Sequence, residues 1–104
     1  SRFAVIRMPT LAADQLRRLL KSVVRNGAEE RIEGCVGLFL DLNEKAVNGE
    51  ISTHPVDLRG MISALRLMTD GMRAKDAIAV SVTNKCFDEY EYQLVQDVVM
   101  TRFA

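Results

Sequence analysis

The sequence predicts an all-α fold, a small bundle of about five helices, and three observations lead to this class. Hydrophobic residues make up 48% of the 104 residues but aromatic residues only 6%, so the core has to be built from Leu, Val, Ile, Met and Ala, a mixture that favours helices over a β-sandwich. Apolar residues recur three and four positions apart in several segments, as on one face of a helix. Turn pairs separate these segments: Asn26-Gly27, Asn48-Gly49 and Asp70-Gly71.

The first two helices are expected on either side of Asn26-Gly27. Thr10 is a suitable N-cap for the first helix. The apolar face of this helix comprises Leu11, Leu16, Leu19, Leu20, Val23 and Val24. The second helix is expected from about Ala28 to Val47 and to be the most buried. Its apolar positions are Ile32, Cys35, Val36, Leu38, Phe39, Leu40 and Leu42. Gly34 and Gly37 lie inside it, where they would let a neighbouring helix approach closely.

The third helix is expected to begin after Asp57, whose carboxylate accepts a first-turn amide as N-cap, and to end at Asp70-Gly71. Its apolar face comprises Leu58, Met61, Ile62, Leu65 and Met68. The helical spacing of Met61, Met68 and Met72 indicates core packing rather than a plastic binding surface.

Two shorter helices complete the predicted bundle. The fourth spans roughly Ala74 to Val82 and turns Ala77, Ile78 and Val82 inward. The fifth opens with a capping box, in which Asp88 is the cap and Glu91 stands three residues on. Its apolar face comprises Leu94, Val95, Val98, Val99 and Phe103.

Arg59 is the candidate functional residue, because it lies in the first turn of the third helix and off the apolar face. A cation there faces the positive end of the helix dipole, which costs a few tenths of a kcal/mol. The same place is where anions bind, so an arginine beside these amides would hold a phosphate. The alternative interpretation is a solvated arginine that tolerates the small penalty.

Composition and motifs exclude several function classes. Fourteen basic and fourteen acidic residues give no net charge, so there is no general field to attract nucleic acid or anionic lipid. No apolar run is long enough for a membrane span, and no signal peptide is visible. Cys35 and Cys86 lack metal-ligand spacing and are expected to be buried thiols in a reducing cytosol, and with His54 as the single histidine no metal site is predicted. No phosphate-binding GxxxxGK[ST] loop is present, so independent catalysis is not expected.

The segment Phe3–Met8 is a short apolar run closed by Pro9, which predicts a strand. No other segment has the pattern of a convincing strand. An unpaired strand at the first residues suggests that the chain begins in the middle of a domain.

Three segments together resemble one protein family. Ser1–Ile6, with its Arg-Phe pair, is similar to the end of the nucleotide-binding core of AAA+ ATPases, where such a pair leads into the last core strand. Glu50–Leu67 resembles the start of the lid helix that carries the sensor-2 arginine. Asn84–Val95 is similar to the closing helices of the MoxR-like branch, which includes the CbbQ, NorQ and NirQ type proteins. The Walker A and Walker B motifs would lie upstream of Ser1.

The resemblance implies a domain organisation and a set of partners. Residues 1–9 would be the partial end of the AAA+ core, and residues 10–104 its C-terminal helical lid. The full-length parent would be a cytoplasmic ATPase that uses ATP and Mg²⁺, whereas this segment alone would bind no cofactor and have no activity. Its partners would be its own AAA+ core domain, neighbouring subunits of a ring, commonly a hexamer, and a client protein complex remodelled in a chaperone-like way. The isolated segment is expected to be a monomer or a weak dimer.

The resemblance also implies the site residues. Arg59 would be the sensor-2 arginine that reaches the γ-phosphate of ATP, and Arg2 would be the arginine finger for the neighbouring subunit's nucleotide. In a competing alignment His54 takes the sensor-2 position, and it would be the weaker phosphate partner at neutral pH.

Two other hypotheses stay open beside the lid. The first is a free-standing helical interaction module, whose partner docks beside the Met-rich third helix. The second is a DNA-binding helix-turn-helix domain, which the charges favour least. The basic residues of the first helix are Arg17, Arg18, Lys21 and Arg25. The acidic residues that follow and offset them are Glu29, Glu30 and Glu33. The basic residues are interpreted as a solvated face or as a surface that docks on the core.

Overall fold

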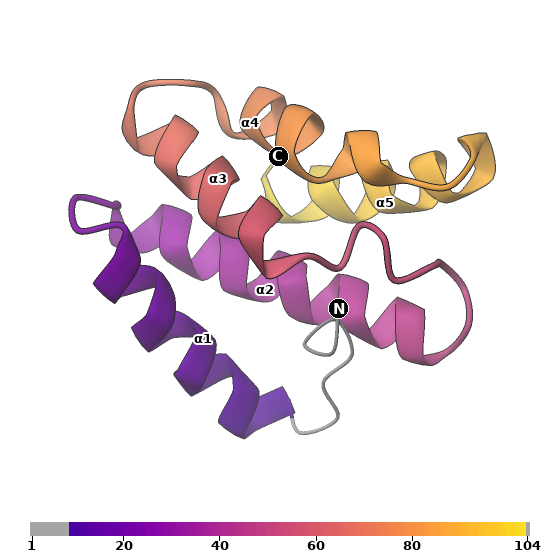
Figure 1. The fold of residues 1–104 in the computed structure, drawn as a ribbon, viewed down its shortest axis with the longest axis horizontal. Helices are drawn as coiled ribbons and strands as arrows, with labels where there is room; N and C mark the ends of the chain where they lie inside the picture. The colour runs from indigo at the N-terminus through magenta and orange to yellow at the C-terminus, as the bar shows by residue number, and fades with distance from the viewer. Residues whose placement is uncertain (1–8, 104) are drawn as a thin grey trace.

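The computed structural model describes the backbone of residues 9–103 and the side chains of residues 13–103, and in this part of the chain helices joined by loops are the only regular secondary structure (Figure 1). The helices are α1 (Pro9–Val23), α2 (Glu29–Val47), α3 (Leu58–Thr69), α4 (Ala74–Ser81), a short 3₁₀ helix η1 (Thr83–Lys85) and α5 (Glu89–Arg102). The predicted all-α class with five helices is confirmed for these residues. The expected strand Phe3–Met8 lies outside the described residues.

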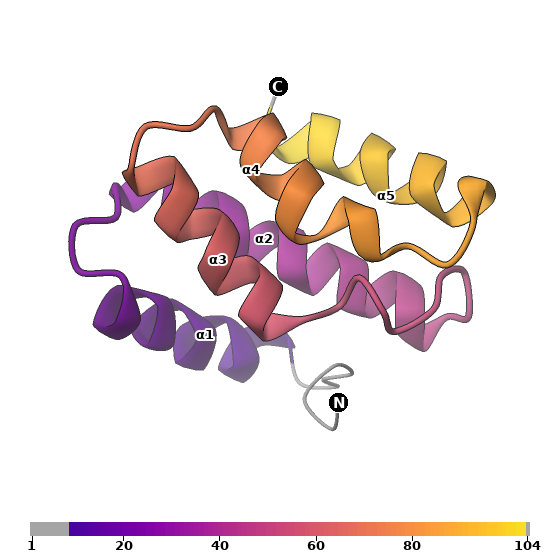
Figure 2. The same cartoon turned by 45° about the horizontal axis from the view of Figure 1, so that its top comes forward.

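Helix α2 is the centre of the bundle, as its predicted burial requires. It packs against α1, α3 and α5, and α3 packs closely against α4. Figure 2 shows α1 and α5 on opposite sides of α2. The largest fully buried apolar side chains are Leu20, Leu38, Phe39, Leu42, Val56, Met61, Leu65, Ile78, Val82, Val95 and Val99. Burial of such a core, at roughly 25 cal/mol per Å² of apolar surface, is what holds short helices together.

Three glycines mark where the helices approach most closely. A Cβ atom at Gly34 would lie 2.6 Å from the ring of Phe103, and one at Gly37 would lie 2.6 Å from the guanidinium of Arg102. The C-terminal end of α5 therefore lies directly on α2, which confirms the predicted close approach. At Gly60 a Cβ atom would lie 2.6 Å from the carbonyl oxygen of Ser81, so the start of α3 and the end of α4 are also in contact.

The predicted helix faces are largely buried, with two exceptions. Leu19 was expected in the core, but 36% of it is exposed, because α1 packs mainly against α2 and uses Leu16, Leu20 and Val24. Met72 was expected in the core, but it is 38% exposed, because it follows the end of α3 in the turn before α4.

The two cysteines are free thiols. Cys35 is buried, and burial raises the pKa of its thiol to about 12. Cys86 is half-buried, and burial together with Glu91 and Asp88 raises the pKa of its thiol to about 11. Both thiols are protonated at neutral pH, which makes them poor nucleophiles.

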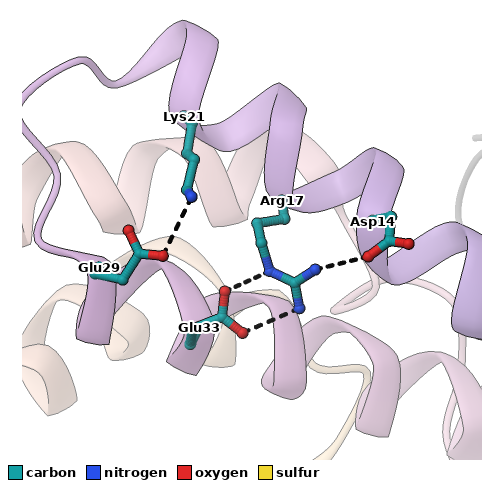
Figure 3. Close-up of polar contacts among 5 residues, drawn as sticks. All are labelled: Asp14, Arg17, Lys21, Glu29 and Glu33. Carbon is teal, nitrogen blue, oxygen red and sulfur yellow. Dashed lines mark hydrogen bonds and ion pairs between the residues drawn. The ribbon is translucent and has the colours of Figure 1, made fainter.

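Ion pairs on the surface join α1 to α2 (Figure 3). Arg17 lies between Asp14 of its own helix, 2.9 Å away, and Glu33 of α2, to which it donates from two guanidinium nitrogens. Lys21 pairs with Glu29 at 3.1 Å. Two of the basic residues considered for DNA binding are thus engaged by carboxylates of the next helix.

Candidate functional site

The start of α3 is organised around the carboxylate of Asp57. One oxygen, Oδ1, accepts the backbone N–H of Arg59 at 3.0 Å, which confirms Asp57 as the N-cap. The other oxygen, Oδ2, accepts a hydrogen bond from the Nζ atom of Lys85 at the end of η1. Burial raises the pKa of the Asp57 carboxyl, but the hydrogen bond and charge of Lys85, with the N–H groups of Arg59 and Gly60, outweigh it and leave the pKa below its usual range. The first turn of α3 is therefore held by an ionised cap.

Arg59 projects from this capped turn into solvent. Its side chain is exposed, and within the described part of the chain it forms no hydrogen bond or ion pair. No other described residue neutralises the charge of its guanidinium. Arg2, expected as a second site residue, lies outside the described residues.

His54 lies in the loop before α3, on the same end of the molecule. It is exposed, and its ring centroid is 6.5 Å from that of Phe87 in a tilted arrangement. Its backbone N–H donates to the hydroxyl of Ser52 at 3.3 Å. His54 therefore contacts the loop and Phe87, three residues before the N-cap Asp57.

A buried carboxylate fastens this loop to α5. Glu91 is 5% exposed, and it accepts the backbone N–H of Ser52, the hydroxyl of Ser52 and the backbone N–H of Phe87. The predicted cap is confirmed, because Asp88 accepts the N–H of Glu91 at 2.9 Å. The reciprocal contact differs from a simple capping box, since Glu91 binds Phe87 rather than the cap itself. No local pattern in the sequence pointed to Ser52 as its partner.

Two aromatic side chains near the contact between Glu91 and Ser52 are largely exposed. Phe87 is 73% exposed and Tyr90 is 72% exposed, so these large apolar groups are left uncovered at the start of α5. By contrast, Met61 and Met68 of α3 are buried. Of the three methionines at the third helix, Met72, in the turn that follows it, is the exposed one.

A cavity of about 560 Å³ opens where the starts of α2 and α4 meet the end of α5. Its charged lining residues are Glu30, Arg31, Arg73, Lys75, Asp76 and Arg102. Sequence reasoning missed this group, because its members come from three helices and no segment contributes a basic run.

The structure describes no further site of the kinds considered. Among residues 13–103 no three His, Cys, Asp or Glu side chains gather as a metal site would require. None of the described helices combines the length and apolar character needed to cross a bilayer. Comparison with known protein families, curated proteins and solved structures finds no match to this chain.

Proposed function

We propose that this chain is the C-terminal lid of a MoxR-type AAA+ ATPase, in which Arg59 is the sensor-2 arginine. The observation that supports the proposal is the state of this side chain. It is exposed and unpaired within the described residues, yet it stands on a helix start that Asp57 and Lys85 hold in place. A fixed helix end with a free guanidinium is what recognition of a phosphate requires.

In this proposal the chain contributes side chains to ATP hydrolysis and does not itself hold the nucleotide or the metal. Arg59 would place its guanidinium against the terminal phosphate of ATP, which the missing core would hold with Mg²⁺. A positive charge there stabilises the negative charge that spreads over the phosphoryl oxygens in the transition state. Because Asp57 already accepts the N–H of Arg59, the contribution comes from the side chain rather than from the helix amides.

The proposal has a direct test in two steps. The coding sequence upstream of Ser1 is expected to encode a phosphate-binding loop. In the protein that this sequence encodes, Arg59→Ala is expected to lower the rate of ATP hydrolysis by a factor of about 10²–10³, the size reported for losing one electrostatic group from a transition state. Arg66→Ala is the matched control, because Arg66 is an exposed arginine near the other end of α3.

Equal rates for the Arg59 and Arg66 variants would refute the sensor-2 assignment. His54→Ala in the same assay distinguishes the competing alignment, since it would then be the variant that loses activity. Arg2→Ala tests the arginine finger, and its defect should be rescued in mixed rings with subunits that keep Arg2 but cannot bind nucleotide.

The second candidate function is a free-standing helical module that binds a partner protein. The exposure of Phe87 and Tyr90 favours it, because large aromatic groups of this kind often form the centre of protein interfaces. A start codon close to Ser1, with no phosphate-binding loop upstream, would favour this function over the lid.

A further inference from the structure

Basic side chains outnumber acidic ones in the lining of the cavity between α2, α4 and α5. Four basic side chains, Arg31, Arg73, Lys75 and Arg102, line it together with two acidic ones, Glu30 and Asp76. Four positive and two negative charges leave a surplus of two positive charges. The net charge of the whole chain is zero, so positive charge is concentrated at this cavity.

These four cations differ in how far they are already neutralised. Arg73 pairs with Asp76 at 3.1 Å, and Arg102 donates from two guanidinium nitrogens to Asp41, at 2.7 and 3.1 Å. Arg31 and Lys75 form no ion pair or hydrogen bond within the described residues. Arg31 is also half-buried. An anion in the cavity would gain most from these two side chains.

The backbone adds donors at the same place. Helix α2 begins after Ala28 and α4 after Arg73, and neither start has a side-chain cap. Helices α3 and α5, in contrast, are capped by Asp57 and Asp88. The first-turn N–H groups of α2 and α4 therefore lack the acceptor that the other two starts have, and both turns contribute to the cavity.

We propose that this cavity binds an oxyanion of the phosphate class. Unpaired cations that approach from α2 and α4 suit a tetrahedral group that accepts hydrogen bonds from several directions. The volume of about 560 Å³ leaves room for a diphosphate or an organic phosphate as well as for a single phosphate.

This site is independent of the proposed role of Arg59. Arg59 stands at the first turn of α3, next to the end of α4, whereas the cavity lies at the start of α4. The eight residues of α4, at about 1.5 Å per residue, separate the two. Either site would persist if the other were refuted.

The test is a titration of the 104-residue chain with pyrophosphate at constant ionic strength, followed by the backbone amide NMR spectrum. Shifts are expected to saturate and to concentrate at residues 29–31, 73–76 and 102–103. Lys75→Gln and Arg31→Gln, alone and together, are expected to weaken binding, with the double variant raising the Kd about tenfold or more. Inorganic phosphate and ATP in parallel titrations distinguish a bare phosphate from an organic one.

The control is the double variant Arg18→Gln, Arg25→Gln, which removes two exposed positive charges from α1 and its end while leaving the cavity intact. It is expected to bind pyrophosphate as the natural chain does, and every variant is checked for folding in the same spectra. Shifts that stay linear in concentration, that spread over all basic surfaces, or that fall equally in the control would overturn the proposal.

Discussion

Two glutamates join distant parts of this bundle, and they do so in different surroundings. Glu91 is 5% exposed and accepts three hydrogen bonds, from Ser52 and Phe87, across the loop that leads to α3. Glu33 joins α2 to Arg17 of α1, but both side chains remain partly in water, 44% and 30% exposed. In both contacts a glutamate binds charged or polar groups of another segment of the chain.

The two contacts differ in how well water can replace the hydrogen bonds once the contact is lost. Around Glu91 the backbone N–H groups of Ser52 and Phe87 would be left without an acceptor in a partly buried place, which is costly. Around Glu33 both ions would simply be hydrated. Polar contacts therefore add to apolar packing at the end of the molecule that carries Arg59, whereas α1 is held by the burial of Leu16, Leu20 and Val24.

The largest effect is expected for Glu91→Ala. Two backbone donors lose their acceptor, so the free energy of unfolding should fall by about 2–6 kcal/mol, at roughly 1–3 kcal/mol per unsatisfied group. Urea denaturation followed by circular dichroism measures it. The matched control is Glu89→Ala in the same turn, where the exposed carboxylate accepts a hydrogen bond from Gln93 and from no other described residue. Equal losses for the two variants would remove the distinction drawn between buried and exposed carboxylates.

The contrast also explains what the sequence could predict. Helix starts and stops depend on neighbouring residues, so Asp57, Asp88 and the turn pairs identified them within one or two positions. The contact between Glu91 and Ser52 spans 39 residues, and no local pattern carries it. The capping box predicted that Glu91 would bind backbone, but not that it would close a second loop.

Exposure was harder to predict than secondary structure for the same reason. The apolar arc of α1 includes Leu19, but only the packing of α1 on α2 decides which part of the arc is covered. The cavity lined by Arg31, Lys75 and Arg102 likewise exists only once three helices meet. Arg59 could be identified as a candidate from the sequence because its position in a helix turn is a local property. Its function remains a proposal.

A smaller effect is expected for Asp57→Ala, which sharpens the comparison because Asp57 is intermediate in exposure, at 30% of its side chain. Loss of an N-cap should lower the free energy of unfolding by about 1 kcal/mol at neutral pH. Because Lys85 and the helix amides hold the pKa of Asp57 below its usual range, its contribution is present above the unfolded pKa of about 3.9 and is lost as pH falls through the folded pKa.

Denaturation series between neutral pH and about pH 2.5 measure this dependence, the lower limit lying below the usual carboxyl range. The difference between the natural chain and Asp57→Ala should shrink as the pH falls through that range. Asp70→Ala, at the opposite end of α3, is the control. Asp70 is not the N-cap, so the stability difference between this variant and the natural chain should not shrink in the same way as the pH falls. A difference that stays constant with pH would mean that the cap acts without its charge.

The smallest effect is expected for Arg17→Gln, which removes the pair that joins α1 to Glu33. Its melting temperature should change less than that of Asp57→Ala, and about 0.5 M salt should reduce the difference, because screening weakens exposed pairs. The hydrogen bond from Arg17 lowers the pKa of Glu33, so in the variant this pKa should rise toward its usual value in an NMR titration. Arg18→Gln, the neighbouring exposed arginine without a partner among the described residues, should leave it unchanged. If Arg17→Gln instead detached α1 from α2, the exposed ion pairs rather than the leucines would be holding that helix. The contrast drawn between Glu91 and Glu33 would then be refuted.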